Sequence, residues 1–267
     1  MSIPENPTRL EDLPPFFDVI YCRCRARKFD EAITIFQSYG NGIRESLIYR
    51  FGVYEFFLSL IREFFPNRNL NTLPFVTGLK NQNTLLNLVS YCLRRLGRLV
   101  EAKKVSLQFL STQAEPNEDN EGILTYQSLG VIDTDLGNLP EAKNILSQAA
   151  EIVQNTQGTQ NKIRAFASLG WVCFLRGEIE LARKYYNQAN QIGYQTRGYG
   201  VFSMLGGQYA TFLLMTGNVQ DSQRYTEDNL ARCIEKHWPE AVSYCKCLLG
   251  DIAVMETRLI EARNFYF

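Results

Sequence analysis

The sequence predicts an all-α protein made of antiparallel helix pairs stacked into a solenoid. Three observations lead to this fold class: the sequence repeats every 40 residues, apolar residues within a repeat recur at helical spacing, and glycines fall at fixed places between the helices. The composition is that of an ordinary folded protein, with 45% hydrophobic and 21% charged residues among 267. We therefore expect one solenoid over residues 1–267.

The repeat is clearest in four segments that align without a gap. They read LGRLVEAKK (96–104), LGNLPEAKN (136–144), RGEIELARK (176–184) and TGNVQDSQR (216–224). Each segment has a glycine in the same phase, and a small residue follows five positions later. These small residues, continued into the next repeat, are Ala102, Ala142, Ala182, Ser222 and Ala262. Such self-similarity is typical of solenoids, in which each unit packs on its neighbours.

Each repeat is expected to contain two helices. Between Ile123 and Leu136 the apolar residues follow helical spacing, and Gly137 then ends the helix, because glycine adopts a left-handed conformation at little cost. A second helix begins near Pro140, since proline is tolerated in a first turn. Small residues in both helices are expected to allow a close approach, and they are Gly130, Gly170, Gly250, Ala142, Ala182 and Ala262.

This pattern resembles the tetratricopeptide repeat (TPR). In that family a small residue of the first helix precedes an alanine of the second by twelve positions, as Gly170 precedes Ala182 and Gly250 precedes Ala262. The family's large residue of the second helix falls on Leu146, Tyr186 and Tyr266. The resemblance implies a right-handed superhelical TPR-like solenoid. The period of 40 exceeds the usual period of about 34 residues, and the proline that usually closes each unit is missing.

The N-terminal third follows the repeat less regularly. We expect irregular helical hairpins over residues 13–65, a polar loop over 66–82, and regular 40-residue repeats over 83–267. The segments LPPFFDVIYCRCRARKFDEA, FGVYEFFLSLIREFF and LVSYCLRRLGRLVEA, within residues 13–105, resemble TPR modules attached to bacterial STAND-type signalling ATPases. The nucleotide-binding pattern G-x-x-x-x-G-K-[ST] does not occur, so no ATPase motor is expected in this sequence.

The TPR resemblance implies a concave groove lined by the first helix of each unit. The groove candidates are Tyr21, Arg25, Tyr91, Arg94, Arg95, Gln127, Trp171, Phe174, Met215 and Asp251, with Leu175, Leu214, Val254 and Met255 in matching phases. The lining is basic and aromatic at its N-terminal end and apolar further on, which suits an acidic-hydrophobic protein or peptide segment. The alternative is that these side chains are buried within the helix layers.

No catalytic or metal site is expected. The single histidine, His237, could join Cys233, Cys245 and Cys247 in a zinc site, but two cysteines two positions apart on a helix point in different directions. Packing of buried thiols is the favoured interpretation, with no cofactor. We expect a non-catalytic scaffold, adaptor or sensor. The alternative is a receptor for a small ligand or a signalling peptide in a bacterial regulatory system.

Charge and chain ends give weaker indications. Residues 1–110 carry 15 Lys and Arg against 10 Asp and Glu, an excess too small to favour nucleic acid as a partner. No apolar run is long enough to span a membrane, and no secretory leader is recognised. With an odd number of cysteines, seven, we expect free thiols and a cytoplasmic setting. The last helix lacks a polar cap, which predicts continuation of the array or pairing with another copy.

Overall fold

The computed structural model describes residues 7, 9–38, 46–111, 120–154, 156 and 158–266. Every regular element in these ranges is a helix, which confirms the predicted all-α class. Contacts divide the chain into two compact units, Met1–Gly137 and Asn138–Phe267. The sequence predicts a single domain with regular repeats over 83–267, whereas this boundary falls inside those repeats, directly after a turn glycine.

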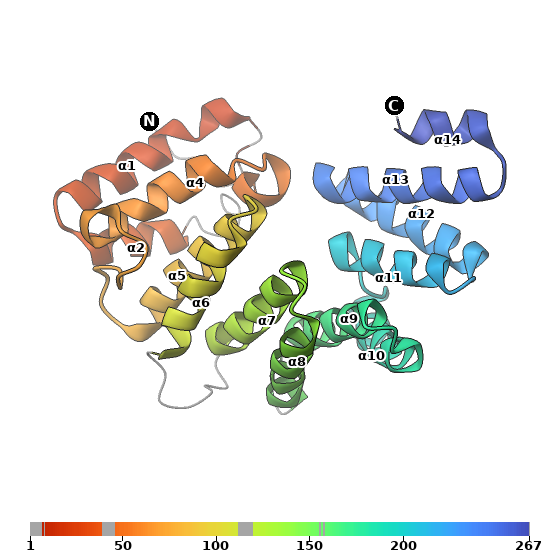
Figure 1. Cartoon of the computed structure of the whole chain (residues 1–267). Coiled ribbons are helices and arrows are strands. Elements are labelled where there is room, and N and C mark those ends of the chain that lie inside the picture. The colour runs from red at the N-terminus through yellow and green to blue at the C-terminus, as the bar shows by residue number, and fades with distance from the viewer. Residues whose placement is uncertain are drawn as a thin grey trace. The chain divides into compact units, whose positions relative to one another are not determined.

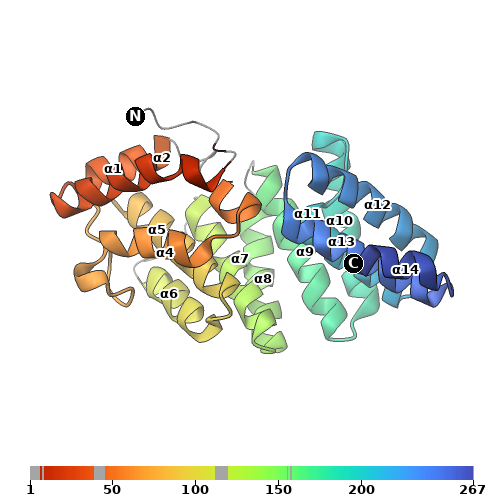
Figure 2. The same ribbon diagram turned by 90° about the horizontal axis from the view of Figure 1, so that it is seen from above.

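Unit 1 contains the shorter and less regular helices. Its elements are η1 (Leu10–Asp12), α1 (Pro14–Arg25), α2 (Phe29–Ser38), η2 (Ser46–Arg50), α4 (Tyr54–Ile61), η3 (Arg62–Phe64), η4 (Pro66–Arg68), α5 (Leu79–Arg95), α6 (Leu99–Ser111) and α7 (Asn120–Asp135). Helix α1 pairs with α2, and α5 packs against α4, α6 and α7 (Figures 1 and 2). Aromatic rings fill the centre, where Phe36 stacks on Phe57 with centroids 5.8 Å apart.

The predicted polar loop of unit 1 is shorter than expected. Helix α5 begins at Leu79, so residues 79–82 are helical rather than part of the loop. The remaining connection is tied to the helices by backbone hydrogen bonds. The Phe75 amide donates to the Phe64 carbonyl oxygen over 2.8 Å, and the Thr77 amide donates to Asp30 Oδ1 over 2.7 Å. These bonds attach the segment to η3 and α2.

Unit 2 contains the regular repeats. Its helices are α8 (Leu139–Gln154), α9 (Thr159–Leu175), α10 (Ile179–Arg197), α11 (Ser203–Met215), α12 (Val219–Glu235), α13 (Pro239–Met255) and α14 (Leu259–Tyr266). The pairs α9/α10, α11/α12 and α13/α14 follow one another in a stack (Figure 1). The first helices also touch each other, α9 with α11 and α11 with α13. They therefore form a continuous layer within unit 2.

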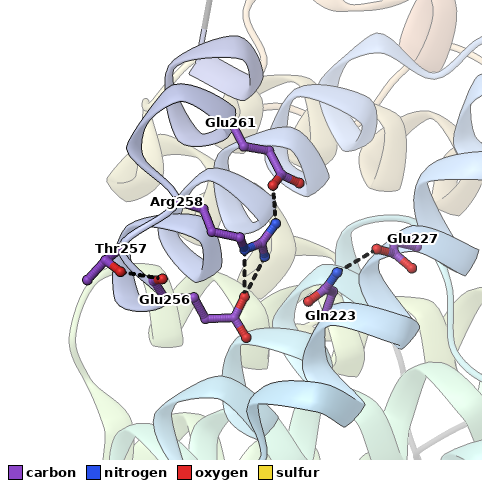
Figure 3. Close-up of polar contacts among 6 residues, drawn as sticks. All are labelled: Gln223, Glu227, Glu256, Thr257, Arg258 and Glu261. Carbon is purple, nitrogen blue, oxygen red and sulfur yellow. Dashed lines mark hydrogen bonds and ion pairs between the residues drawn. The ribbon is translucent and has the colours of Figure 1, made fainter.

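The turns inside the pairs keep the predicted phase. Gly177 and Gly217 adopt φ of 78° and 86°, and Thr257 takes the same place in the last pair with φ of 60°. A non-glycine residue in this region is strained. Figure 3 shows how the last turn is held, with Arg258 paired to both Glu256 and Glu261. It also shows a separate hydrogen bond on α12, between Gln223 and Glu227.

The helices of a pair approach closely where the sequence places small residues. Ala142, Ala182 and Ala262 are buried. A Cβ atom on Gly170 would lie 2.9 Å from Cδ2 of Tyr186, and one on Gly250 would lie 2.5 Å from Cε1 of Tyr266. Real Cβ atoms essentially never come this close, so the fully buried Tyr186 ring requires glycine at position 170, while the exposed Tyr266 ring would have to shift to accept a side chain at position 250. The predicted close approach is therefore confirmed at the α9/α10 and α13/α14 pairs.

Candidate partner-binding surface

An exposed row of apolar side chains crosses the layer of first helices in unit 2. Leu175, Met215 and Met255 are the last residues of α9, α11 and α13, and they stand 40 residues apart in the sequence. Their exposed fractions are 42%, 69% and 59%. Val254, next to Met255, is exposed as well. We call these four residues the apolar stripe. Solvent-exposed apolar residues are common singly, but a row that repeats in phase is typical of an interaction surface.

Aromatic side chains lie beside the start of the stripe. Trp171 lies four residues before Leu175 and Phe174 directly before it, and both are half-buried. Their ring centroids are 5.5 Å apart, and Phe174 meets Phe212 edge to face at 5.6 Å. This packing fixes both rings, so they present a rigid apolar surface. In contrast, Leu214 is buried and belongs to the helix layers.

The charged groups that flank the stripe are paired with each other. In the α9–α10 turn, Glu178 accepts from Lys143 Nζ over 2.5 Å and from Arg176 Nε over 2.7 Å. These two bonds lower the pKa of the Glu178 carboxyl to about 2, so it is ionised at neutral pH. Arg258 is paired in the same way in the α13–α14 turn (Figure 3). The charged side chains of both turns are therefore already engaged in ion pairs.

Asp251 lies at the far end of this surface and is exposed. Its carboxylate accepts a hydrogen bond from the Tyr266 hydroxyl over 2.6 Å. This bond raises the pKa of Tyr266 to about 12. Of the predicted groove residues, unit 2 thus places Trp171, Phe174, Met215 and Asp251 on one layer of helices, with Met215 the most exposed among the hydrophobic ones.

Most of the predicted groove residues of unit 1 lie on two helices, α1 and α5. On α1, the Arg25 guanidinium lies 4.9 Å from the ring centroid of Tyr21, and both residues are exposed. On α5, Tyr91 and Arg95 are half-buried and both contact Tyr54, at 6.3 Å and 5.6 Å.

Two of the groove candidates in unit 1, Arg94 and Gln127, do not present a free polar side chain at the surface. Arg94 Nε lies 2.6 Å from Asp135 Oδ2, so its charge is already balanced within the unit. Gln127 is only 1% exposed and lies in the interior, so it does not line a surface. The structure thus does not support its place in the predicted groove. The predicted groove therefore has less free positive charge at its N-terminal end than the sequence predicts.

The cysteine and histidine residues do not assemble a metal site. Cys233 and Cys245 are buried, and Asn229 Nδ2 donates to Cys245 Sγ over 3.2 Å. Cys247 is exposed, and His237 is exposed in the turn between α12 and α13. Within the described ranges no three His, Cys, Asp or Glu side chains are arranged to hold a metal ion. Nor does any described helix have the length and apolar character needed to cross a bilayer.

Comparison with known proteins supports the repeat assignment. Residues 121–192 match the model of the tetratricopeptide repeat family, which covers the units built on Gly130 and Gly170. No curated protein matches the chain significantly. The resemblance of residues 13–105 to modules of STAND-type ATPases is not confirmed by these matches.

Solved structures with the same architecture cover most of the chain. RapI in its apo form is 14% identical with a TM-score of 0.59, covering 94% of this chain and 93% of RapI. BtubC (BKLC) from P. vanneervenii is 13% identical with a TM-score of 0.56, covering 81% and 86%. The TPR-like repeats of a putative kinesin light chain from P. anserina are 15% identical with a TM-score of 0.52, covering 71% and 93%. These likenesses show a TPR-like solenoid fold.

Proposed function

We propose that this protein is a non-catalytic scaffold, adaptor or sensor that holds a protein or peptide segment against the apolar stripe of unit 2. TPR-like folds bind proteins or peptides, and the stripe is the observation that carries the proposal to particular residues. Leu175, Met215 and Met255 recur in phase on three adjacent helices and remain exposed. A segment laid across α9, α11 and α13 would bury all three.

The chemistry of the stripe suits an apolar face of the partner. Full burial of a leucine or methionine side chain stabilises a complex by about 1.5–3 kcal/mol. Methionine adapts its shape to different partners because its side chain is unbranched and flexible. Because Lys143 and Arg176 are paired with Glu178, and Arg258 is paired with Glu256 and Glu261, these charges give little selection for a strongly acidic segment. We therefore propose an amphipathic partner that places its apolar side here.

A receptor for a signalling peptide or a small ligand is the second candidate. The exposure of the stripe favours a peptide over a small molecule, because small-molecule sites usually enclose their ligand. A cytoplasmic setting is part of the proposal. Its support is chemical: all seven cysteines are free thiols, which suits a reducing compartment.

The test uses peptides selected from a random library for binding to the full chain. Met215→Glu is expected to raise the dissociation constants of the selected peptides at least about tenfold, because a carboxylate would have to be desolvated within the contact. The matched control is Ile234→Glu, which changes an apolar residue that is 53% exposed on α12, a second helix. Dissociation constants measured by calorimetry that are unchanged in Met215→Glu, or that are raised equally by both substitutions, would contradict the proposal.

A further inference from the structure

The connection between α10 and α11 gathers two arginines and three aromatic rings. The guanidinium carbons of Arg197 and Arg232 lie 4.6 Å and 4.2 Å from the ring centroid of Tyr199. Arg197 also lies 4.9 Å from the ring centroid of Phe202, and Phe202 stacks on Trp238 at 5.3 Å with an interplanar angle of 21°. All five side chains are half-buried. They come from the C-terminal ends of α10 and α12 and the connections that follow.

This connection is held in place by side chains of the neighbouring helices. Asn190 Oδ1 accepts from the Val201 amide over 2.9 Å, and the Tyr225 hydroxyl lies 2.6 Å from the Val201 carbonyl oxygen. A Cβ atom on Gly193 would lie 2.7 Å from the Tyr199 carbonyl oxygen, so the connection is pressed against α10. Tyr199 is therefore positioned before any ligand arrives, which lowers the entropic cost of binding.

The positive charge of Arg197 has only neutral partners. Its Nη1 donates to Gln160 Oε1 over 2.9 Å, and its Nη2 donates to the Gly200 carbonyl oxygen over 2.7 Å. Burial and the nearby charge of Arg232 lower the pKa of the Arg197 guanidinium. Elsewhere in unit 2, Arg176 and Arg258 are neutralised by carboxylates, as Figure 3 shows for Arg258. The Arg197 and Arg232 pair has no such counter-charge among the described residues.

Arg232 has its hydrogen-bonding groups available. It stacks on Tyr199, and in the described part of the chain its guanidinium donates to no acceptor. A guanidinium carries five N–H donors in a planar fork, which matches two oxygens of a carboxylate or phosphate. The fork is fixed by the aromatic ring beneath it while its donors remain unused. Stacked arginines of this kind are suited to planar, bidentate recognition of oxyanions.

We propose that Arg232, Arg197 and Tyr199 form a second binding site, for an oxyanion group, phosphate or carboxylate, carried by a ligand. Arg232 supplies the hydrogen-bonding fork and Arg197 supplies a second positive charge. The stacked rings of Phe202 and Trp238 supply an apolar wall for whatever carries the anion. The site is built from the α10–α11 and α12–α13 connections, whereas the apolar stripe lies at the opposite, C-terminal ends of the first helices. It does not depend on the function proposed for the stripe.

Binding at the two sites can be measured separately, because each site has one of the two tryptophans of the chain. Trp238 belongs to the oxyanion site and Trp171 lies beside the stripe. We suggest following both indole N–H signals by NMR while inorganic phosphate or succinate is added at constant ionic strength. A saturable shift of the Trp238 signal is expected with at least one probe, with the Trp171 signal unchanged. Saturation by phosphate alone indicates a phosphoryl ligand, and saturation by succinate indicates a carboxylate ligand.

Substitutions on α12 provide the controls. Arg232→Gln is expected to raise the dissociation constant of the probe about tenfold, since it removes a charge-assisted contact. Arg232→Lys is expected to bind the probe with an affinity between those of Arg232→Gln and the parent protein. Arg224→Gln is the matched control, because Arg224 is an exposed arginine of the same helix paired with Asp221. The Arg224→Gln variant should bind the probe with the same affinity as the parent protein. Absence of a saturable shift with both probes, or equal affinities in Arg232→Gln and the parent, would overturn the proposal. Equal shifts of both tryptophans would overturn it too.

Discussion

Replacing Gly170 by valine is expected to lower the free energy of unfolding by about 3 kcal/mol or more. Three ring atoms of Tyr186 would lie within 3.0 Å of a Cβ atom at this position. The ring cannot move aside easily, because Tyr186 is fully buried and lies against Tyr209 and Phe212 with centroids 4.9 Å and 5.2 Å away. A branched side chain would therefore force α9 and α10 apart.

Chemical denaturation followed by circular dichroism measures this effect. The matched control is Asn187→Val, which places valine at an exposed position of α10 and reports only its lower helix propensity. A double substitution, Gly170→Ala with Tyr186→Leu, is expected to lose less stability than the sum of its parts, because leucine occupies the phase of Tyr186 at Leu146. If Gly170→Val is no less stable than Asn187→Val, the close helix crossing is refuted.

The second large effect is expected for Asn229→Ala, which should cost about 2–3 kcal/mol. Asn229 is buried, and its amide group makes two bonds to one residue. Oδ1 accepts from the Ser203 amide over 2.7 Å, and Nδ2 donates to the Ser203 carbonyl oxygen over 3.0 Å. Ser203 begins α11 with φ of 63°, an uncommon conformation for a non-glycine residue. Alanine would leave these two backbone groups without their partner.

Thermal or denaturant unfolding of Asn229→Ala, beside Asn187→Ala as an exposed control, measures the loss. Hydrogen exchange at residues 203–206 gives a local measurement, because loss of the clamp should speed exchange at the start of α11 more than in α9. A stability change under about 0.5 kcal/mol would show that Asn229 contributes little. The same residue donates to Cys245, so α11 and α13 are both expected to respond.

The repeat architecture could be predicted because it depends on local rules. A helix ends where the backbone turns left-handed, and two helices cross closely where side chains are small. Both rules place small residues at fixed spacing in the sequence, and so Gly177, Gly217 and Ala182 indicate where the helix pairs lie. Thr257 shows the strength of this phase, since it adopts the left-handed turn without being glycine.

The surfaces were harder to predict because they depend on contacts between distant residues. Arg94 reads as a free cation in the sequence, yet Asp135, 41 positions later, neutralises it. Gln127 was expected to line the groove but lies in the interior. Arg197 and Arg232 are 35 residues apart and meet only because the α10–α11 connection folds back onto α10.

Methionine methyl NMR can show whether a partner binds across the row of Leu175, Met215 and Met255. The chain has four methionines: two belong to the stripe, and Met204 lies in the first turn of α11, away from it. Adding a peptide selected for binding should shift the Met215 and Met255 methyl signals together and leave that of Met204 in place. A peptide that binds tightly while both stripe methionines keep their signals unchanged would show that the partner binds elsewhere.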